Sequence, residues 1–321
     1  MTDTRISLTT KGGGVRADRL FRFSALAAGL LVLAILALIL VTTSREAWPV
    51  FADEGLSFLT SKTWDPASNE FGALAFVYGT VIVSLISLLI AVPVSLGIAL
   101  FLTELAPRRL RTPAVTVIDL LAAIPSVVFG LWGILVVAPA LYKLYQALHD
   151  TLGGVPVIGS LFGTPVGGGR SFMTAGIILA IMIIPIITSI SREVFATVPS
   201  SDKQAAYALG ATRWEMIKGA VFPHSFGGLV GAVMLGLGRA MGETIAVALT
   251  IGAATQITPN LFAGGNAMPS VIVLEFSEST GEWTAALIGL GVFLFVITVL
   301  VNVLARLVVN RAEIRMKGAV A

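Results

Sequence analysis

The sequence predicts an all-α integral membrane protein with six transmembrane helices, and three observations support this fold class. The chain has 321 residues, of which 56% are hydrophobic and 12% charged, whereas soluble domains carry about 25% charged residues. The apolar residues gather into six stretches that are long enough to cross a bilayer as helices. The basic residues between these stretches are strongly biased toward one side of the predicted membrane.

The six predicted spans have approximate limits of 21–43, 72–103, 113–141, 171–191, 224–254 and 283–309. The first follows a basic tail, as the apolar region of a signal peptide does. Its apolar core of about 20 residues is too long for a signal peptide, and no small-residue cleavage site follows it. We therefore expect this helix to be retained.

Lysine and arginine predict the orientation, because they accumulate in cytoplasmic segments. They are concentrated in the N-tail, the loops 104–112 and 192–223, and the C-tail. The residues concerned are Arg5, Lys11, Arg16, Arg19, Arg22, Arg108, Arg109, Arg111, Arg192, Lys203, Arg213, Lys218, Arg306, Arg311, Arg315 and Lys317. The outer side carries Arg45, Lys62, Lys143 and Arg170. Both termini are therefore predicted to be cytoplasmic.

Three longer segments lie on the predicted outer side. Residues 44–70 contain two tryptophans and several acids and suggest an interfacial cap. Residues 142–170 are rich in glycine but lack the lysine and the strand-to-helix context of a nucleotide loop, so we expect a mobile loop. Residues 256–282 combine glutamates with apolar residues, which suggests a short amphipathic or re-entrant piece closing the outer mouth.

Two charges within the fifth apolar stretch are the most informative feature of the sequence. Residues 236–244 read Gly-Leu-Gly-Arg-Ala-Met-Gly-Glu-Thr. A charge at bilayer depth costs at least about 2.5 kcal/mol, so a chain carries it for assembly or for function. Arg239 and Glu243 are four residues apart and can pair on one face of a helix. The pattern suggests an anion path, and a purely structural ion pair is the alternative.

The loop 192–223 predicts two short helices at an angle. Ser201 and Gln204 have the spacing of a capping box at the start of the first helix, and Thr212 and Glu215 repeat it for the second. Gly210 between them fits a left-handed helix stop. Pro223 then marks the entry to the fifth span.

This loop resembles the coupling loop of permease subunits of bacterial ABC importers, which reads E-A-A, three residues, G, nine residues, I-x-L-P. Gln204, Ala220 and Phe222 depart from the family residues but leave the spacing and the glycine unchanged. The resemblance implies a type I ABC-importer (MetI-like) fold, in which residues 202–217 dock into a cleft of the ATPase subunit. The expected coupling residues are Gln204, Ala205, Ala206, Gly210, Arg213 and Glu215. A plain helical hairpin capping a bundle is the alternative.

Two further segments narrow the resemblance to phosphate importer permeases. Residues 118–133 are similar to their third helix and residues 238–247 to their fifth. The chain length, the long outer loop and the Thr-Ile-Ala-Val that follows the glutamate favour the C-type over the A-type subunit of the Pst system. The resemblance covers roughly residues 70–310. It implies phosphate transport, and a planar arginine fork is suited to phosphate oxygens.

The expected substrate pathway contains Arg239, Glu243, Thr244, Asp119 and Ser126. Asp119 is either a second pathway group or a residue at the cytoplasmic end of its helix, and Thr244 and Ser126 are candidate polar liners. The A-type partner permease and a permease for another oxyanion, such as sulfate or molybdate, stay open within the same class. A membrane scaffold or sensor that transports nothing is the alternative from a different class.

Catalysis by the chain itself is not expected. The sequence has no cysteine, its two histidines are far apart, and it contains neither H-E-x-x-H nor a Walker A motif. We therefore expect a non-catalytic subunit without a metal or cofactor, whose ATP and Mg²⁺ are bound by a partner ATPase. The resemblance implies as partners a homologous PstA-like permease, two PstB-like ATPase subunits, an extracytoplasmic PstS-like phosphate-binding protein, phosphate and the bilayer of the bacterial inner membrane, with no nucleic acid.

The predicted domain organisation follows from these segments. It comprises a cytoplasmic N-tail (1–20), the first transmembrane helix with an extracytoplasmic segment (21–70), a permease core (71–310) that includes the coupling loop 192–223, and a cytoplasmic C-tail (311–321).

Overall fold

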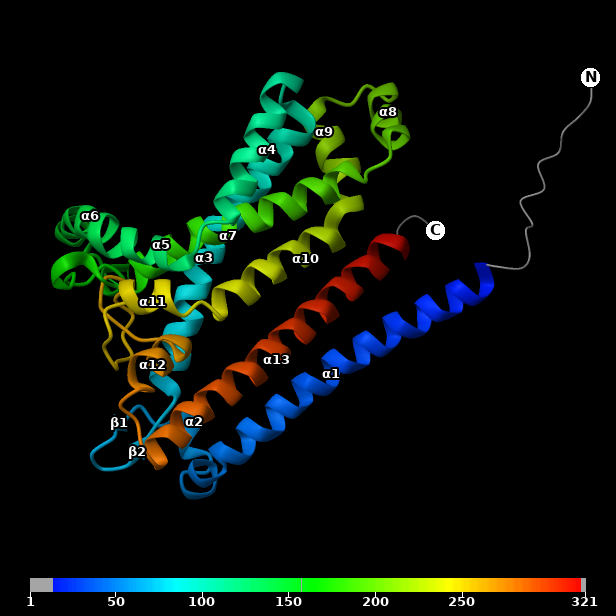
Figure 1. The fold of residues 1–321 in the computed structure, drawn as a ribbon. Helices are drawn as coiled ribbons and strands as arrows, with labels where there is room; N and C mark the ends of the chain where they lie inside the picture. Colours follow the sequence, from blue (N-terminus) through cyan, green and yellow to red (C-terminus); the bar gives the residue numbers. More distant parts are fainter. Residues whose placement is uncertain (1–13, 157, 319–321) are drawn as a thin grey trace, which may run out of the picture.

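The computed structural model describes residues 14–156 and 158–318, and the chain is almost entirely helical (Figure 1). Six segments of this part are long and apolar enough to cross a membrane, which confirms the predicted fold class. They are Ala17–Asp53, Leu74–Leu105, Ser126–Leu152, Gly167–Ala196, Arg213–Met241 and Glu282–Leu307. The start of the predicted N-tail and the end of the predicted C-tail lie outside the described residues.

The longer helices are listed here in chain order. They are α1 (Gly14–Asp53), α3 (Leu74–Leu100), α4 (Arg108–Ala122), α6 (Ala138–Leu152), α7 (Phe172–Ala196), α10 (Phe222–Met241) and α13 (Glu282–Gly318). The shorter helices are α2 (Ser57–Thr60), α5 (Ser126–Trp132), α8 (Ser200–Ala208), α9 (Arg213–Met216), α11 (Ile245–Thr250) and α12 (Met268–Glu275). Wide π turns are η1 (Phe101–Leu105), η2 (Gly133–Val137) and η5 (Ile217–Val221), and 3₁₀ turns are η3 (Ile158–Ser160) and η4 (Gly167–Gly169). The strands β1 (Trp64–Asp65) and β2 (Glu70–Phe71) form an antiparallel hairpin.

Helix α7 lies at the centre of the core, between α3 and α10. Small residues let these helices approach one another closely, as is usual within membranes. A Cβ added at Gly236 of α10 would lie 2.6 Å from the side chain of Ile187, and one at Gly228 would lie 2.6 Å from Val194. Helix α1, by contrast, runs beside α13 (Figure 1), and its apolar side chains are exposed except near its C-terminal end, where Ala47 and Val50 are buried.

The segments that the sequence predicts on the outer side are hydrogen-bonded to the rest of the fold. The Trp64 and Trp283 indoles both donate to Oε2 of Glu275, at 2.9 and 3.1 Å, which joins the hairpin to α12 and α13. In the predicted mobile loop, the Val166 N–H donates to the Phe262 carbonyl at 3.2 Å. The Leu261 N–H donates to the Leu161 carbonyl at 3.0 Å. Two loops that are distant in sequence therefore satisfy each other's backbone groups, and the mobility expected for residues 142–170 stays a prediction.

The third predicted span, 113–141, is wrong in its limits. The chain leaves the helical conformation at residues 123–125, between α4 and α5, and the membrane-length helix runs from Ser126 to Leu152. Pro125 explains the break, because proline has no N–H to donate and disfavours a helical conformation in the residue before it. The motif at 118–133 therefore extends over the end of α4, the break and α5 rather than one continuous helix.

The fifth predicted span, 224–254, is also wrong in its limits. The helix is continuous from Arg213 through η5 and α10 to Met241, so Pro223 does not mark its entry. The π turn directly before α10 accommodates the proline, because a widened turn leaves room for the missing hydrogen bond. At the other end the helix stops at Met241 and resumes as α11 after residues 242–244.

Candidate functional site

The break between α10 and α11 is stabilised by its own polar side chains. The Thr244 hydroxyl donates to the Gly242 carbonyl at 3.2 Å. Oε1 of Glu243 accepts the Ala246 N–H at 3.4 Å, so the carboxylate caps the start of α11. A helix can be interrupted within a membrane when nearby groups satisfy the freed backbone in this way.

Arg239 and Glu243 form the predicted ion pair across this break. Nη2 of Arg239 lies 3.6 Å from Oε2 of Glu243. The Glu243 side chain is 6% exposed, whereas that of Arg239 is 49% exposed. The pairing is confirmed, but Glu243 lies beyond the end of α10 rather than on its face. One partner is thus fixed and buried, while the guanidinium keeps donors free for another ligand.

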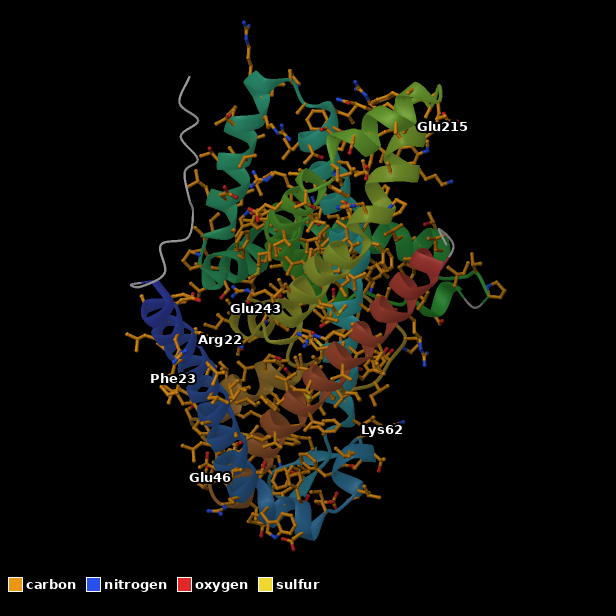
Figure 2. The ribbon with its side chains drawn as sticks, turned by 90° about the vertical axis from the view of Figure 1, so that its right-hand side faces the viewer. Arg22, Phe23, Glu46, Lys62, Glu215 and Glu243 are labelled. Carbon is orange, nitrogen blue, oxygen red and sulfur yellow. The ribbon has the colours of Figure 1, made fainter. Side chains whose placement is uncertain are left out.

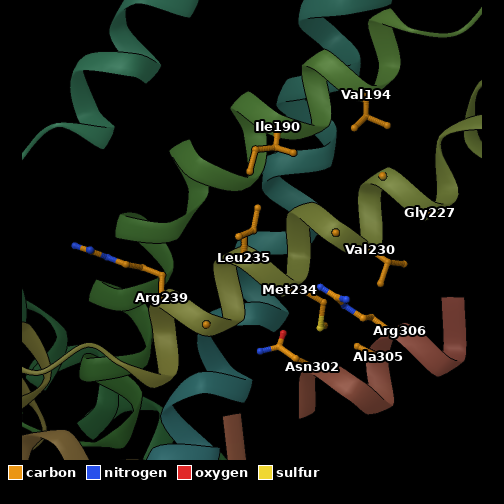
Figure 3. A pocket seen from close by; sticks show the side chains of 13 residues that line it. Ile190, Val194, Gly227, Val230, Met234, Leu235, Arg239, Asn302, Ala305 and Arg306 are labelled. Carbon is orange, nitrogen blue, oxygen red and sulfur yellow. The ribbon is translucent and has the colours of Figure 1, made fainter. Parts of the chain in front are cut away.

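The pair lies at mid-depth in the molecule. Figure 2 shows Glu215 near one end, Glu46 and Lys62 toward the opposite end, and Glu243 between them. Arg239 borders a groove of about 870 Å³ between α7, α10 and α13, lined on α10 by glycines and apolar residues (Figure 3). Arg239 thus stands at one end of this groove.

The other predicted pathway residues are divided between two regions. Thr244 is within the break and half-buried, and Ser126 is the first residue of α5 and half-buried. Helix α5 packs against α11, so Ser126 belongs to the elements that surround the break. Asp119 is exposed on α4, which packs against α7 instead, and the structure does not bring it to the ion pair.

Gly130 sets the distance between α5 and α11. A Cβ at this position would lie 2.9 Å from the Ala246 Cα and 2.8 Å from the Leu249 side chain. Ala246 is also the residue whose N–H binds Glu243. Gly130 therefore lets α11 lie close to α5, in the position where Ala246 can bind Glu243 of the ion pair. The sequence motif alone gave this glycine no role.

We expect Gly130→Ala to destabilise the protein by about 1–3 kcal/mol, as overpacking does. The new methyl group would meet the Ala246 Cα, a backbone atom that cannot rotate away as a side chain can. The matched control is Gly97→Ala on α3, where a Cβ would meet nothing within 4 Å. Alanine favours a helix over glycine, so the control should be neutral or stabilising. The thermal midpoint of each purified variant in detergent checks this, and equal midpoints would contradict it.

The second predicted site is the segment from α8 to α9. Gly210 has φ of +84°, and the N–H groups of Gly210 and Ala211 donate to the carbonyls of Tyr207 and Ala206 at 2.9 and 3.1 Å. This is the Schellman arrangement that a helix-stop glycine permits. The capping box at α9 is confirmed as well. The Glu215 N–H reaches the Thr212 hydroxyl at 3.4 Å, and the Thr212 N–H donates to Glu215 Oε2 at 2.7 Å.

Two details of this segment differ from expectation. Ser201 is not an N-cap, because α8 begins at Ser200 after Pro199, and the Ser201 hydroxyl donates to Asp202 Oδ1 instead. Glu104 accepts from Lys203 Nζ at 2.6 Å, and only 10% of the Glu104 side chain is exposed. This ion pair joins α8 to the end of the α3–η1 helix. Sequence reasoning missed it, because the two residues are far apart in the chain.

The predicted coupling residues lie on an accessible surface. Gln204, Ala205, Gly210, Arg213 and Glu215 are exposed and Ala206 is half-buried. Helix α8 buries none of its residues. Large apolar side chains accompany them, with Leu209 89% and Trp214 62% exposed. Exposed apolar residues gathered among polar ones are typical of a surface that binds another protein.

Comparisons with known proteins agree with this architecture. Residues 91–314 match the family model of the binding-protein-dependent transport system inner membrane component. The phosphate transport system permease protein PstC of Mesorhizobium japonicum is 46% identical over 93% of this chain and 91% of its own length. PstC of Xylella fastidiosa strain Temecula1 is 45% identical over 97% and 98%, respectively. PstC 2 of Mycobacterium tuberculosis is 44% identical over 91% of each.

Solved structures support the fold. A chain of a bacterial alginate ABC transporter aligns with a TM-score of 0.59 over 92% of this chain and 97% of its own, at 18% identity. A chain of the MetNI methionine ABC transporter, in an inward-facing conformation, aligns with a TM-score of 0.53 over 74% and 94%, at 14% identity. The fold and the family model define the class, a membrane-embedded permease component of a binding-protein-dependent transport system. Within that class, the chain belongs to the PstC family.

Proposed function

We propose that this chain is a permease subunit of an ATP-driven phosphate importer and forms half of its translocation pathway. The observation that carries the proposal is the half-exposed Arg239 side chain, which pairs at mid-depth with the buried Glu243 carboxylate and borders a groove. The phosphate transport named for its relatives agrees with it.

The chemistry of the pair suits a partly protonated anion. A guanidinium offers planar paired donors to phosphate oxygens, and a water-poor site strengthens such bonds. With the site empty, Glu243 neutralises Arg239 and lowers the cost of holding it within the membrane. With phosphate present, the carboxylate accepts a hydrogen bond from a protonated phosphate oxygen. Sulfate at neutral pH has no such proton, so the same carboxylate disfavours it.

The segment from α8 to α9 is the proposed docking surface for the ATPase. Its exposed Leu209 and Trp214 supply apolar contact area, and the Lys203–Glu104 pair connects α8 to a membrane-spanning helix. The basic residues near this end make it the cytoplasmic side by the positive-inside rule, with both termini there. We assign the remaining assembly to a second, homologous permease, two ATPase subunits and an extracytoplasmic binding protein in the inner membrane.

Two observations favour a pathway role over a purely structural ion pair. A buried pair is weak support for stability by itself, because desolvation offsets its attraction. Moreover, half of the Arg239 side chain is accessible and borders the groove, as a ligand-binding cation requires. Asp119 is omitted from the proposed pathway, because it is exposed on α4 away from the pair.

Uptake of labelled phosphate by the complete complex in liposomes tests this function. We expect uptake that requires ATP and is reduced by unlabelled phosphate, but little affected by sulfate or molybdate. Binding of each anion to the isolated binding protein is measured in parallel, so that its selectivity is separated from that of the permease. Absence of ATP-dependent phosphate uptake would favour a scaffold, and equal competition by sulfate would favour a general oxyanion permease.

A further inference from the structure

The groove beside Arg239 continues well beyond that residue. Its α10 wall extends from Gly227 to Arg239, which corresponds to about 18 Å at the rise of an α-helix. Four of the lining positions on this wall are glycines without a side chain, so the groove stays open along α10; they are Gly227, Gly228, Gly231 and Gly238. The space therefore leads from the ion pair toward the end of the bundle that carries α8.

The opposite wall of the groove presents polar groups from α13. Asn302 and Arg306 are four residues apart and both line the groove, with Ala305 between them. Figure 3 shows both side chains projecting from α13 toward α10, whereas the Arg239 side chain extends away from α13. Arg306 is thus directed into the groove rather than into the surrounding lipid, although it lies within the membrane-length segment Glu282–Leu307.

The charges of the groove are of one sign. Its lining, as far as the described side chains go, contains two arginines and no aspartate or glutamate. Within the part of the chain that the structure describes, Arg306 has no ion-pair partner. Asn302 donates one amide hydrogen to the Thr298 carbonyl at 3.0 Å, which orients its amide and leaves the second hydrogen for a ligand. A concave surface that carries an unpaired cation, as Arg306 is here, concentrates anions.

We propose that Arg306 and Asn302 form a second binding station for a tetrahedral oxyanion, located between Arg239 and the cytoplasm. The proposal rests on the proposed function, and the ligand it assigns is the transported phosphate after it leaves Arg239. Arg306 supplies the charge and paired donors, and Asn302 supplies an uncharged donor beside it. Among the described residues no carboxylate lines this station, so it accepts the dianion as readily as the monoanion. If the anion binds weakly both at Arg239 and at this station, it can leave Arg239 and move along the groove toward the cytoplasm.

An anionic lipid headgroup has the same phosphate chemistry, and a helix of the partner permease is another possible occupant of the groove. A single-cysteine experiment separates these occupants without requiring transport. Because the native chain has no cysteine, Ala305→Cys places one thiol of this chain between the two proposed ligands. In the complete complex in zwitterionic lipid, inorganic phosphate should slow alkylation of that thiol, and sulfate should slow it less.

The same protection should disappear when Arg306→Gln is added to Ala305→Cys. As a control, Arg311→Gln is added to Ala305→Cys instead. Arg311 is exposed on the same helix beyond the groove, so this change should leave the protection by phosphate intact. Protection by anionic lipid but not by phosphate would assign the site to a headgroup. A thiol that is unreactive under all conditions would assign the groove to a partner helix. Either result overturns the proposal.

Transport supplies the second readout. Arg306→Gln should lower the maximal rate of ATP-driven phosphate uptake roughly tenfold, as expected when a charge-assisted hydrogen bond is lost, with little change in KM. Arg306→Lys should retain most of the rate. Uptake by the Arg306→Gln complex at the wild-type rate would refute the station alone, whereas a wild-type complex that takes up no phosphate would refute the proposed function.

Discussion

Replacing Arg239 with alanine should reduce ATP-driven phosphate uptake roughly 10- to 100-fold, because a charge-assisted hydrogen bond contributes about 1.5–3 kcal/mol. The substitution removes the pathway cation and leaves the buried Glu243 carboxylate without its partner. Arg239→Lys keeps the charge but loses the planar fork, so its uptake should be intermediate. Labelled phosphate uptake, normalised to the amount of assembled complex in the membrane, measures the effect.

Glu243→Gln separates the electrostatic role of the carboxylate from its structural one. The amide oxygen can still accept the Ala246 N–H, so α11 keeps its cap, while the negative charge is removed. We therefore expect a folded complex with reduced uptake and weaker discrimination against sulfate. Arg45→Ala, on the exposed surface of α1, is the matched control and should transport normally. Normal phosphate uptake by either pair variant, with normal expression, would exclude the pair from the pathway.

The membrane architecture could be predicted from the sequence because apolar length is a local property. Each span is a run of residues whose backbone groups find no water in lipid and must hydrogen-bond within the protein. A helix is the only structure in which a single segment satisfies its own backbone groups. The same locality explains the confirmed capping box at Thr212 and the helix stop at Gly210, since each depends on residues within one turn.

The break between α10 and α11 could not be predicted in the same way. The apolar run from 224 to 254 continues through residues 242–244, and hydropathy alone gives no reason for the helix to stop there. The stop depends on a tertiary fit, in which α11 packs against α5 at Gly130 while Glu243 caps it. The partner of Glu104 was missed for the same reason, since Lys203 comes close only when α3 and α8 are assembled.

Gly210→Val should uncouple the transporter while leaving its membrane insertion unchanged. Gly210 has φ of +84°, and an L-residue pays about 1–2 kcal/mol in the left-handed region, with β-branched residues the least tolerated. Relieving this strain breaks the two hydrogen bonds that end α8 and changes its angle to α9. Because α8 fully buries none of its residues, it is held mainly by the Lys203–Glu104 ion pair, by the packing of Ala206 against the core and by its contacts with α9 and η5.

We expect ATPase association with the Gly210→Val permease, and phosphate uptake, to fall roughly tenfold, equivalent to 1.4 kcal/mol. Two controls distinguish backbone conformation from added bulk. Gly210→Asn should retain most of the activity, since asparagine tolerates the left-handed region. Gly219→Ala adds a side chain to a nearby glycine of ordinary φ with open space around it, and it should behave as wild type. If Gly210→Val binds the ATPase normally, or if replacing all of residues 202–217 leaves that binding intact, the ATPase docks elsewhere on the chain.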